Sequence, residues 1–578
     1  MHGTQRNEIN PNRARKQAVS VMGMNRIKET IKSLCTAACF VLLYGISACA
    51  AEQSVCYNVE TCFGSGVSAA NSGRYEDSIK FFTNALNFGN ASGVGGHEMA
   101  VLLTNRGISY YQINYCATAN EDFKRAISYE KSYAPAYSGL GFCAMSKGDY
   151  KEAVSYYDRA LEYDPAAEDA VYNRSVAKMK LDDLDGAETG LRKAVGLSPD
   201  NVKAYLNLGT ALGMKGDFEG AIENYTKAIE ADPESAYAYK LRGTAYLGAD
   251  DCENAKADFS RAIELDSEDG GIYYYRGECR RREGDLSGAK DDYTKAVEND
   301  PKNSDAYFSR AGIELMLLDS PGAIEDYSKV ISLVPDFGEA YFKRGKIYFL
   351  TGNYVKSAPD LSRAIELGAS PEEAYFLRGE AYTGTGDYDA AFADFDKAFA
   401  LGYDRVSVDA ARARAYRGMK DFNMAVQSYS DAISEAQGGG AGLYLDRAGV
   451  YAEMKNDAAA KKDFDRAAAL APEDPEVFIR RATFYLNKGD ADRALKDAEV
   501  AVKLDPGSEA AYLLRGSVFM KKNDCKKAIP DFDRATTINP RCAEAYKALA
   551  ECYAKTGDKK QAPEFMKKYE LIITTEGE

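Results

Sequence analysis

The feature that most constrains this 578-residue chain is a similarity of the sequence to itself at a fixed interval of about 34 residues. A glycine recurs in one register along much of the chain, at Gly141, Gly209, Gly243, Gly277, Gly345 and Gly379. Twelve residues after the glycine comes a small residue, and four residues later a bulky one, as at Ala221 and Tyr225. A period of this length indicates supersecondary units stacked in a line, each packed on its neighbours.

A single copy of the repeat indicates its secondary structure. Tyr205, Leu208 and Leu212 recur at steps of three and four residues, the periodicity of an amphipathic helix. Gly216 interrupts this pattern, and the small and bulky positions between Ala221 and Ala228 define the face of a second helix. Each copy therefore reads as two helices joined by a tight turn.

The spacing of small, bulky and proline positions resembles the tetratricopeptide repeat, a helix–turn–helix unit of about 34 residues. The resemblance covers nearly everything after residue 58 and implies an all-α fold, an α-α superhelical solenoid of about fifteen tetratricopeptide-like helical hairpins. We place the copies at starting residues 59, 100, 134, 168, 202, 236, 270, 304, 338, 372, 406, 441, 475, 509 and 543. The predicted array has a first part, 59–437, and a second part with a C-terminal cap, 441–578. A glycine joint at 438–440 makes one period a single residue longer than the others and is a candidate flexible joint.

Residues 1–48 form a predicted signal or anchor segment. Residues 1–32 contain seven basic and two acidic side chains, whereas residues 33–48 contain no charge. A basic stretch before a short apolar region is typical of a secretory signal peptide. Ile46-Ser47-Ala48-Cys49 resembles the lipobox of bacterial lipoproteins, which implies lipidation of Cys49, with 49–58 as a short tether.

Two other outcomes fit the same residues. Ala48-Cys49-Ala50 also matches the small-x-small pattern of ordinary signal cleavage, which would release a soluble secreted protein. The uncharged run is just long enough for an uncleaved transmembrane anchor. All three outcomes place the repeats outside the cytoplasm, and the expected location is a membrane-anchored one, in the periplasm or at the cell surface.

Arginine precedes the glycine position in eleven copies, and in nine of them an aspartate follows at one fixed distance along the chain, as Asp258 follows Arg242. Copies with Leu140, Leu208 or Leu549 in place of arginine have no aspartate at the second position. Because the two residue types occur together, we predict buried ion pairs between helices and not an anion-binding surface.

The cysteines follow a second rule. Three pairs share one sequence separation, and each links the start of a second helix to the late part of the next first helix: Cys116–Cys143, Cys252–Cys279 and Cys525–Cys552. We predict that these pairs are disulfides, which would require an oxidising compartment. Cys56–Cys62 is a further candidate pair.

Composition argues against several functions. The net charge of −15 is unfavourable for nucleic-acid binding, which requires a basic face. Only two histidines are present, His2 and His97, and the sequence contains no phosphate-binding glycine loop, metal-ligand cluster or nucleophile–base motif. We therefore expect no enzyme activity, no cofactor, no metal and no small-molecule substrate.

The expected function is the binding of a protein or peptide partner. In the family that the repeats resemble, the first helix of each hairpin lines a concave groove, which would suit an extended or helical peptide. The candidate groove residues are Tyr172, Leu206, Tyr274, Phe308, Leu315, Phe342, Phe349 and Phe376. Burial against neighbouring helices is the alternative for these side chains.

We therefore expect a non-enzymatic adaptor or scaffold held at the membrane of the cell envelope by its N-terminal lipid or anchor. The alternative is a structural or surface spacer protein with no ligand in the groove.

Overall fold

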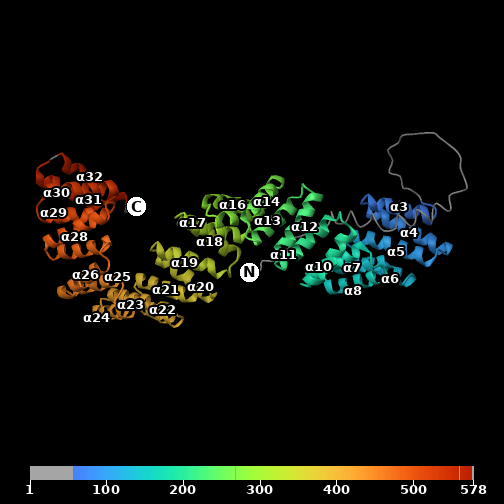
Figure 1. The fold of residues 1–578 in the computed structure, drawn as a ribbon, viewed down its shortest axis with the longest axis horizontal. Coiled ribbons are helices and arrows are strands. Elements are labelled where there is room, and N and C mark those ends of the chain that lie inside the picture. Colours follow the sequence, from blue (N-terminus) through green and yellow to red (C-terminus); the bar gives the residue numbers. More distant parts are fainter. Residues whose placement is uncertain (1–55, 267, 559, 576–578) are drawn as a thin grey trace. The chain divides into compact units, whose positions relative to one another are not determined.

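The computed structural model describes residues 56–266, 268–558 and 560–575 (Figure 1). Within these residues thirty helices, α3 to α32, follow one another with no strand between them, and they form fifteen hairpins. The predicted all-α solenoid is confirmed. Contacts divide the chain into two compact units, the first ending at Pro301 and the second beginning at Lys302.

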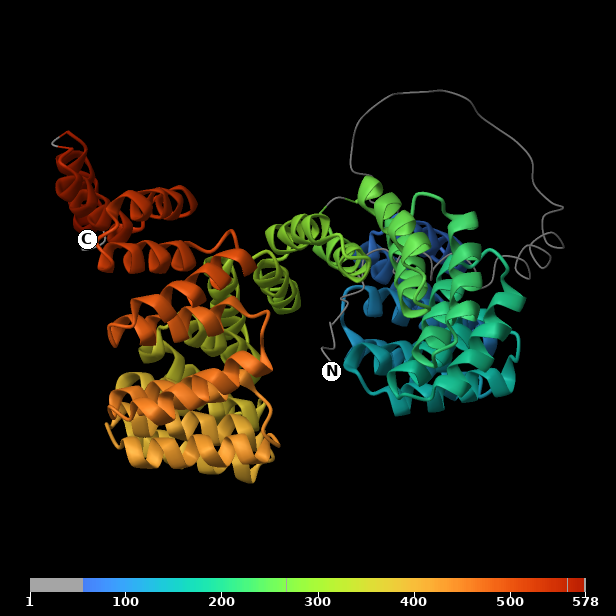
Figure 2. The same ribbon diagram turned by 60° about the vertical axis from the view of Figure 1, so that its left-hand side comes forward.

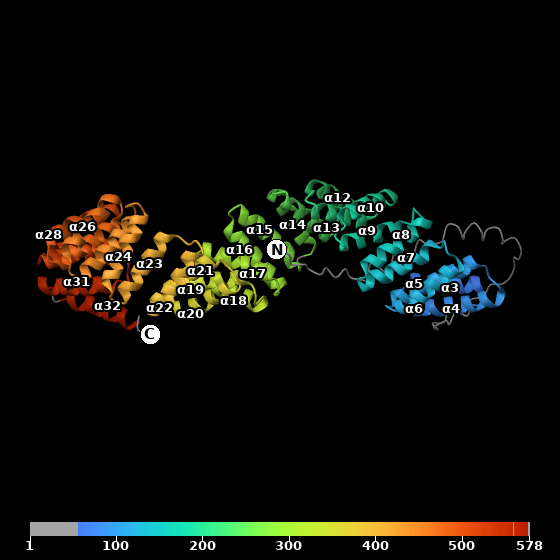
Figure 3. The same ribbon diagram turned by 90° about the horizontal axis from the view of Figure 1, so that it is seen from below.

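The first unit contains seven of the hairpins, and Figure 3 shows α3 to α8 following one another within it. Its helices are α3 (Val59–Asn71), α4 (Tyr75–Ser92), α5 (Gly96–Gln112), α6 (Cys116–Tyr129), α7 (Ala134–Lys147), α8 (Tyr150–Tyr163), α9 (Glu168–Lys180), α10 (Leu184–Leu197), α11 (Val202–Met214), α12 (Phe218–Ala231), α13 (Ala236–Gly248), α14 (Cys252–Leu265), α15 (Gly270–Arg282) and α16 (Leu286–Asn299).

The second unit contains eight hairpins, coloured from green through yellow to red in Figure 2. Its helices are α17 (Ser304–Met316), α18 (Ser320–Leu333), α19 (Gly338–Leu350), α20 (Tyr354–Glu366), α21 (Pro371–Thr385), α22 (Tyr388–Ala400), α23 (Arg405–Gly418), α24 (Phe422–Glu435), α25 (Ala441–Glu453), α26 (Asp457–Leu470), α27 (Pro475–Asn487), α28 (Ala491–Leu504), α29 (Glu509–Lys521), α30 (Cys525–Ile538), α31 (Ala543–Thr556) and α32 (Gln561–Thr575).

The hairpin of α11 and α12 shows why the sequence period exists. Gly216 adopts the left-handed conformation, with φ at 85°, and ends the first helix. The Asp217 side chain then accepts a hydrogen bond of 2.9 Å from the Gly220 amide and caps the second helix. Where the two helices cross, a Cβ atom on Gly209 would lie 2.6 Å from the Tyr225 ring. The recurring glycine therefore marks the closest approach of two helices.

All nine predicted Arg–Asp ion pairs are present, and we call them the arginine ladder. In each pair the Nε and Nη2 atoms of the arginine donate to the two carboxylate oxygens of its aspartate. They are Arg106–Asp122, Arg242–Asp258, Arg276–Asp292, Arg310–Asp326, Arg344–Asp360, Arg378–Asp394, Arg447–Asp463, Arg481–Asp497 and Arg515–Asp531. In the Arg378–Asp394 pair the side chains are only 18% and 7% exposed.

The ladder also joins successive hairpins, which the sequence spacing did not reveal. Arg378 donates through Nη1 to the Ser362 hydroxyl of the preceding hairpin, at 2.8 Å. Arg174 and Arg412, which lack the later aspartate, pair instead with an aspartate of the preceding hairpin: Asp158 for Arg174 and Asp396 for Arg412. These arginines stabilise the stack and are not available to a ligand.

Candidate functional site

The first helices of the hairpins line one side of the second unit. Neighbouring first helices contact each other, as α19 with α21, α21 with α23, and α25 with α27, whereas the second helices of successive hairpins make no comparable contact within the described residues. A stack whose first helices are closer together than its second helices curves toward the first helices. We call the side-chain surface of α17, α19, α21, α23, α25 and α27 the inner surface.

Three of the predicted groove residues belong to the first unit, and all are half-buried: Tyr172, Leu206 and Tyr274. The Tyr172 hydroxyl accepts a hydrogen bond of 2.7 Å from the Asn207 side-chain amide. Burial raises the pKa of Tyr172 to about 12. The ring of Tyr274 lies 6.0 Å from that of Tyr293, measured between centroids. Each aromatic side chain is therefore held by its own neighbours, with part of its surface accessible.

The other predicted groove residues belong to the inner surface of the second unit, where four are half-buried: Phe308, Leu315, Phe349 and Phe376. Phe308 packs edge-on against Tyr327, with ring centroids 5.4 Å apart. Phe376 stacks on Tyr403, with centroids 4.4 Å apart. Each ring is fixed on one side by the protein and partly exposed on the other, and we call these four half-buried side chains the aromatic row.

Phe342 is the exception, because its side chain is only 2% exposed. The prediction that it lies accessible in a groove is wrong. Its ring packs with Leu361, which stands where neighbouring hairpins carry the larger Tyr327 and Phe395. Phe342 fills the space that the smaller leucine leaves, and a partner cannot reach it.

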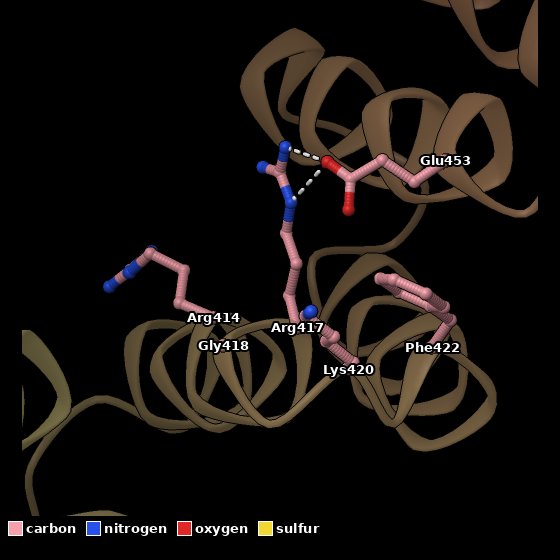
Figure 4. Close-up of a pocket in the computed structure, with 6 residues that line it drawn as sticks. All are labelled: Arg414, Arg417, Gly418, Lys420, Phe422 and Glu453. Carbon is pink, nitrogen blue, oxygen red and sulfur yellow. Dashed lines mark hydrogen bonds and ion pairs between the residues drawn. The ribbon is translucent and has the colours of Figure 1, made fainter. Parts of the chain in front are cut away.

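A cavity of about 400 Å³ opens between α23 and α25, and we call it the basic hollow. Its lining residues are drawn in Figure 4: Arg414, Arg417, Gly418, Lys420, Phe422 and Glu453. α23 and α25 approach each other less closely than α21 and α23, or α25 and α27, do. The extra residue of the lengthened period lies in the turn between α24 and α25.

Two arginines of the lining form ion pairs between first helices, Arg414–Glu380 and Arg417–Glu453, and a third pair of this kind, Arg480–Asp446, joins α27 to α25. The hydrogen bond to Glu453 raises the pKa of Arg417, so this guanidinium is charged at any ordinary pH. The side chains of Arg414 and Arg417 are 41% and 39% exposed, about twice the exposure of Arg378 in the ladder.

Positive charge is concentrated at this position. A Cβ atom on Gly449 would lie 3.7 Å from Arg480 Nη2 and 3.9 Å from Arg417 Nη2, so both guanidinium groups converge on a residue without a side chain. Burial raises the pKa of Tyr429 to about 12, and Arg414, Arg417 and Arg480 oppose that shift. The arrangement offers several hydrogen-bond donors to an anion in an open space.

Sequence reasoning did not identify the basic hollow. Arg414 and Arg417 are one helical turn apart, at the ninth and twelfth positions of their copy, and no other copy has basic residues at both positions. This pattern was a usable signal. Only the fold shows that both positions face a cavity.

The structure brings the predicted cysteine pairs together as unbonded thiols. The Cys143 thiol lies 3.8 Å from the backbone oxygen of Cys116, and the Cys116 sulfur lies 3.3 Å from the Ser146 hydroxyl. Burial, aided by the neighbouring thiol of Cys252, raises the pKa of Cys279 to about 12. Whether these pairs oxidise to disulfides stays a prediction.

The third pair has the same arrangement. Burial, aided by the Cys525 thiol, raises the pKa of Cys552 to about 12. One disulfide is present among the described residues, between Cys56 and Cys62, with Cα atoms 4.8 Å apart. Buried, protonated thiols of this kind oxidise slowly, because the thiolate is the reacting form.

The predicted lipidation site, Cys49, and the whole leader lie outside the described residues. Within the described part of the chain, no helix has the length and apolar character needed to cross a membrane. The same residues contain no group of histidine, cysteine and acidic side chains that could hold a metal ion.

Comparison with protein families gives matches to models described as the tetratricopeptide repeat. The matched residues are 134–166, 202–235, 240–304, 280–336, 315–372, 372–401, 445–509 and 513–572. Together these matches span more than half of the chain. A comparison with curated proteins gives no match.

Several solved structures are similar to parts of this chain. YrrB, described as a TPR protein with an unusual peptide-binding site, is 25% identical, with 32% of this chain and 92% of YrrB covered and a TM-score of 0.29. PilF of Pseudomonas aeruginosa is 20% identical, with coverages of 36% and 93% and a TM-score of 0.32. A tetratricopeptide repeat protein from Parabacteroides merdae is 23% identical, with coverages of 43% and 98% and a TM-score of 0.31.

Proposed function

Since this chain belongs to the tetratricopeptide repeat family, whose architecture is typical of scaffolds for protein–protein interaction, we propose that it is a non-enzymatic adaptor in the cell envelope. In this proposal a partner protein binds the inner surface of the second unit. The N-terminal segment exports the chain, and lipid on Cys49 anchors it.

One observation carries the proposal: the inner surface presents a half-buried aromatic row beside an open basic cavity. Phe376 of the row precedes Glu380 by one turn of α21, and Glu380 pairs with Arg414 at the basic hollow. One face of each ring packs within the protein and contributes to folding. The other face remains accessible and is free to contact a partner. Aromatic and arginine side chains are the types enriched at protein interfaces.

The envelope location is supported by the leader. Its basic region, uncharged run and Ser47-Ala48-Cys49 end fit a lipoprotein signal, and the Cys56–Cys62 disulfide that follows favours an oxidising compartment. Metabolic labelling with a fatty-acid analogue should mark the wild type and leave Cys49→Ala unmarked. Equal labelling of both proteins would remove the lipoprotein claim.

Partner capture tests the binding function. The full chain, expressed in its own envelope and crosslinked, should retain a reproducible partner in a pull-down analysed by mass spectrometry. Phe308→Ser and Phe376→Ser together should reduce this capture, whereas Phe399→Ser, on the second helix α22 and 45% exposed, should not. Thermal unfolding of each variant separates lost binding from lost structure.

Two results would contradict the proposal. Equal capture by the Phe308/Phe376 variant and by wild type would mean that the partner binds a surface other than the aromatic row. A wild-type chain that retains no protein would favour the alternative, a spacer with an empty inner surface.

A further inference from the structure

We propose that the basic hollow binds side-chain carboxylates of an acidic segment of the partner protein. This inference rests on the proposed function and names the chemistry of its partner. The starting point is the charge of the cavity wall. Arg414, Arg417 and Lys420 line the cavity beside Glu453; Arg414 pairs with Glu380 and Arg417 with Glu453, which leaves the charge of Lys420 in excess in a chain whose net charge is −15. An excess of positive charge here is therefore a local feature and does not follow from composition.

The donors of the basic hollow are incompletely used, in contrast to those of the ladder. Arg378 engages Nε, Nη1 and Nη2 with Asp394 and Ser362. Arg417 directs Nε and Nη2 to one oxygen of Glu453, as Figure 4 shows, and within the described residues its Nη1 has no hydrogen-bond partner. A guanidinium with free donors at the edge of a cavity can bind a second carboxylate.

Lys420 adds a charge with no counterpart. It forms no ion pair within the described part of the chain, and it occupies the turn between α23 and α24 with φ at 64°. Lys420 is exposed at the rim of the cavity, beside two arginines that each share their carboxylate only in part, so an anion entering the cavity would meet one unpaired cation and the free donors of Arg417. The arrangement of these cations therefore favours an anion bound in the cavity.

The size and surroundings of the cavity fit a peptide. Its volume of about 400 Å³ lies within the range of about 300–1,000 Å³ for ligand sites. Phe422 in the lining and Met419 beside it, 46% exposed, offer apolar contact for the aliphatic part of a glutamate or a flanking side chain. Phe376 of the aromatic row lies one turn of α21 before Glu380, whose carboxylate pairs with Arg414 of the cavity. An extended segment can thus place an acidic side chain in the hollow and apolar side chains along the row.

The test uses the full chain and two fluorescein-labelled peptides, one with four glutamates spaced by serine and glycine, and one with glutamine at each of those positions. Fluorescence anisotropy should show binding of the glutamate peptide about ten-fold tighter than that of the glutamine peptide, weakening as salt is raised. Arg414→Gln with Arg417→Gln should abolish this difference. Equal binding of both peptides by wild type, or a difference that survives in the double variant, would overturn the proposal.

A matched control comes from the second helices. Arg363 and Arg493 have side chains 40% and 57% exposed, similar to the arginines of the basic hollow, and they lie on α20 and α28. Arg363→Gln with Arg493→Gln removes the same charge and should leave the preference for glutamate unchanged. Loss of the preference in this control would mean that net charge, and not the cavity, attracts the peptide.

Glu453→Gln gives a test in the opposite direction. Because Glu453 competes with the ligand for Arg417, its neutralisation should tighten binding of the glutamate peptide several-fold. Unchanged or weaker binding would contradict a role for Arg417 as a ligand-binding group. The same peptide with phosphoserine in place of glutamate gives a further outcome. If it binds and the glutamate peptide does not, the cavity recognises phosphate and the carboxylate proposal is overturned.

The outcomes separate this inference from the proposed function. If the wild type and the Arg414/Arg417 variant capture the same partner equally, the scaffold function stands and the acidic-segment inference fails. If the wild type captures no partner, the proposed function fails whatever the peptides do.

Discussion

Arginine has two different roles in this chain, and the contrast between the arginine ladder and the basic hollow shows what distinguishes them. In the ladder, Arg378 is 18% exposed, and all three of its nitrogens donate to groups within the protein. In the basic hollow, Arg417 is 39% exposed and shares one oxygen of Glu453 between two nitrogens. Both groups consist of arginines. They differ in how deeply the side chain is buried and in how many of its guanidinium nitrogens donate to groups within the protein.

The difference follows from helix spacing. Ladder arginines sit where the two helices of a hairpin are in contact, and a charge buried there needs a partner. The arginines of the basic hollow sit where α23 and α25 stand further apart and water can enter. We therefore expect the ladder to control stability and the basic hollow to control binding.

The largest effect should come from breaking one rung of the ladder. Arg378→Ala leaves Asp394, which is 7% exposed, without its cation, at a cost of about 3–5 kcal/mol in the free energy of unfolding. The array itself supplies a matched replacement, because one copy has Leu208 and Asn224 at the corresponding positions. Arg378→Leu with Asp394→Asn should recover much of the loss.

Urea unfolding of the single and double variants measures this coupling. Additive effects of Arg378→Leu and Asp394→Asn would show that the two residues do not stabilise each other. Arg378 is preferable to Arg276 for this cycle, because Arg280 also contacts Asp292 and would remain as a partner.

The same contrast between buried and open side chains applies to the phenylalanines of the inner surface. Phe342→Ala should cost about 3–5 kcal/mol, because it empties an enclosed site. Phe308→Ala removes a ring that is only half-buried, so its loss in the free energy of unfolding should be about half as large. Thermal unfolding of both variants tests this order. An equal loss would mean that Phe308 belongs to the core and offers nothing to a partner.

The cysteine pairs test whether the repeats are linked covalently after export. A disulfide that closes a loop of this length should stabilise by about 3 kcal/mol, less any strain. Mass spectrometry of a non-reducing digest of the exported protein should show Cys116–Cys143, Cys252–Cys279 and Cys525–Cys552 peptides. Because the pKa of Cys279 and of Cys552 is raised to about 12, oxidation of the reduced protein in vitro should quicken as the pH rises. If all six cysteines of the exported protein are free thiols, the disulfide prediction is wrong and no longer supports export.

The smallest effect on stability should come from the basic hollow. Arg414→Gln weakens an ion pair whose arginine is 41% and whose glutamate is 15% exposed; because the glutamine amide can still donate to Glu380, the variant should cost about 1 kcal/mol in the free energy of unfolding, well below Arg378→Ala. Urea unfolding beside the Arg378 variants gives the comparison directly. A loss close to that of Arg378→Ala would place Arg414 among the structural arginines and erase the distinction.

The sequence predicts the fold well, because the constraint repeats fifteen times. A small residue is needed where a ring such as Tyr225 crosses the first helix, and most copies have glycine there while the others have alanine or serine, as at Ala311, so the copies repeat one signal. The arginine ladder was predictable for a similar reason, since copies such as that of Leu208 lose both partners together. The third ladder contact, from Arg378 to Ser362, was not predictable, because serine and threonine are common on helices.

The inner surface was predicted less well, because exposure there depends on one neighbour at a time. Phe342 is buried since Leu361 leaves room for it, and its position in the repeat is the same as that of the half-buried Phe308. The basic hollow depends on the spacing of α23 and α25, which a one-residue change in period suggests but does not determine. Leader residues such as Cys49 lie outside the described part of the chain, and their role stays a prediction.

The central claim is that the two groups of arginines divide stability from binding, and paired measurements on two double variants test it most directly. Crosslinked partner capture and thermal unfolding would be compared for Arg414→Gln with Arg417→Gln, and for Arg378→Leu with Asp394→Asn. The account predicts that the first variant melts as wild type does and loses most of its capture, whereas the second keeps its capture. Unchanged capture by the first variant, or a melting temperature that falls together with its capture, would contradict the account.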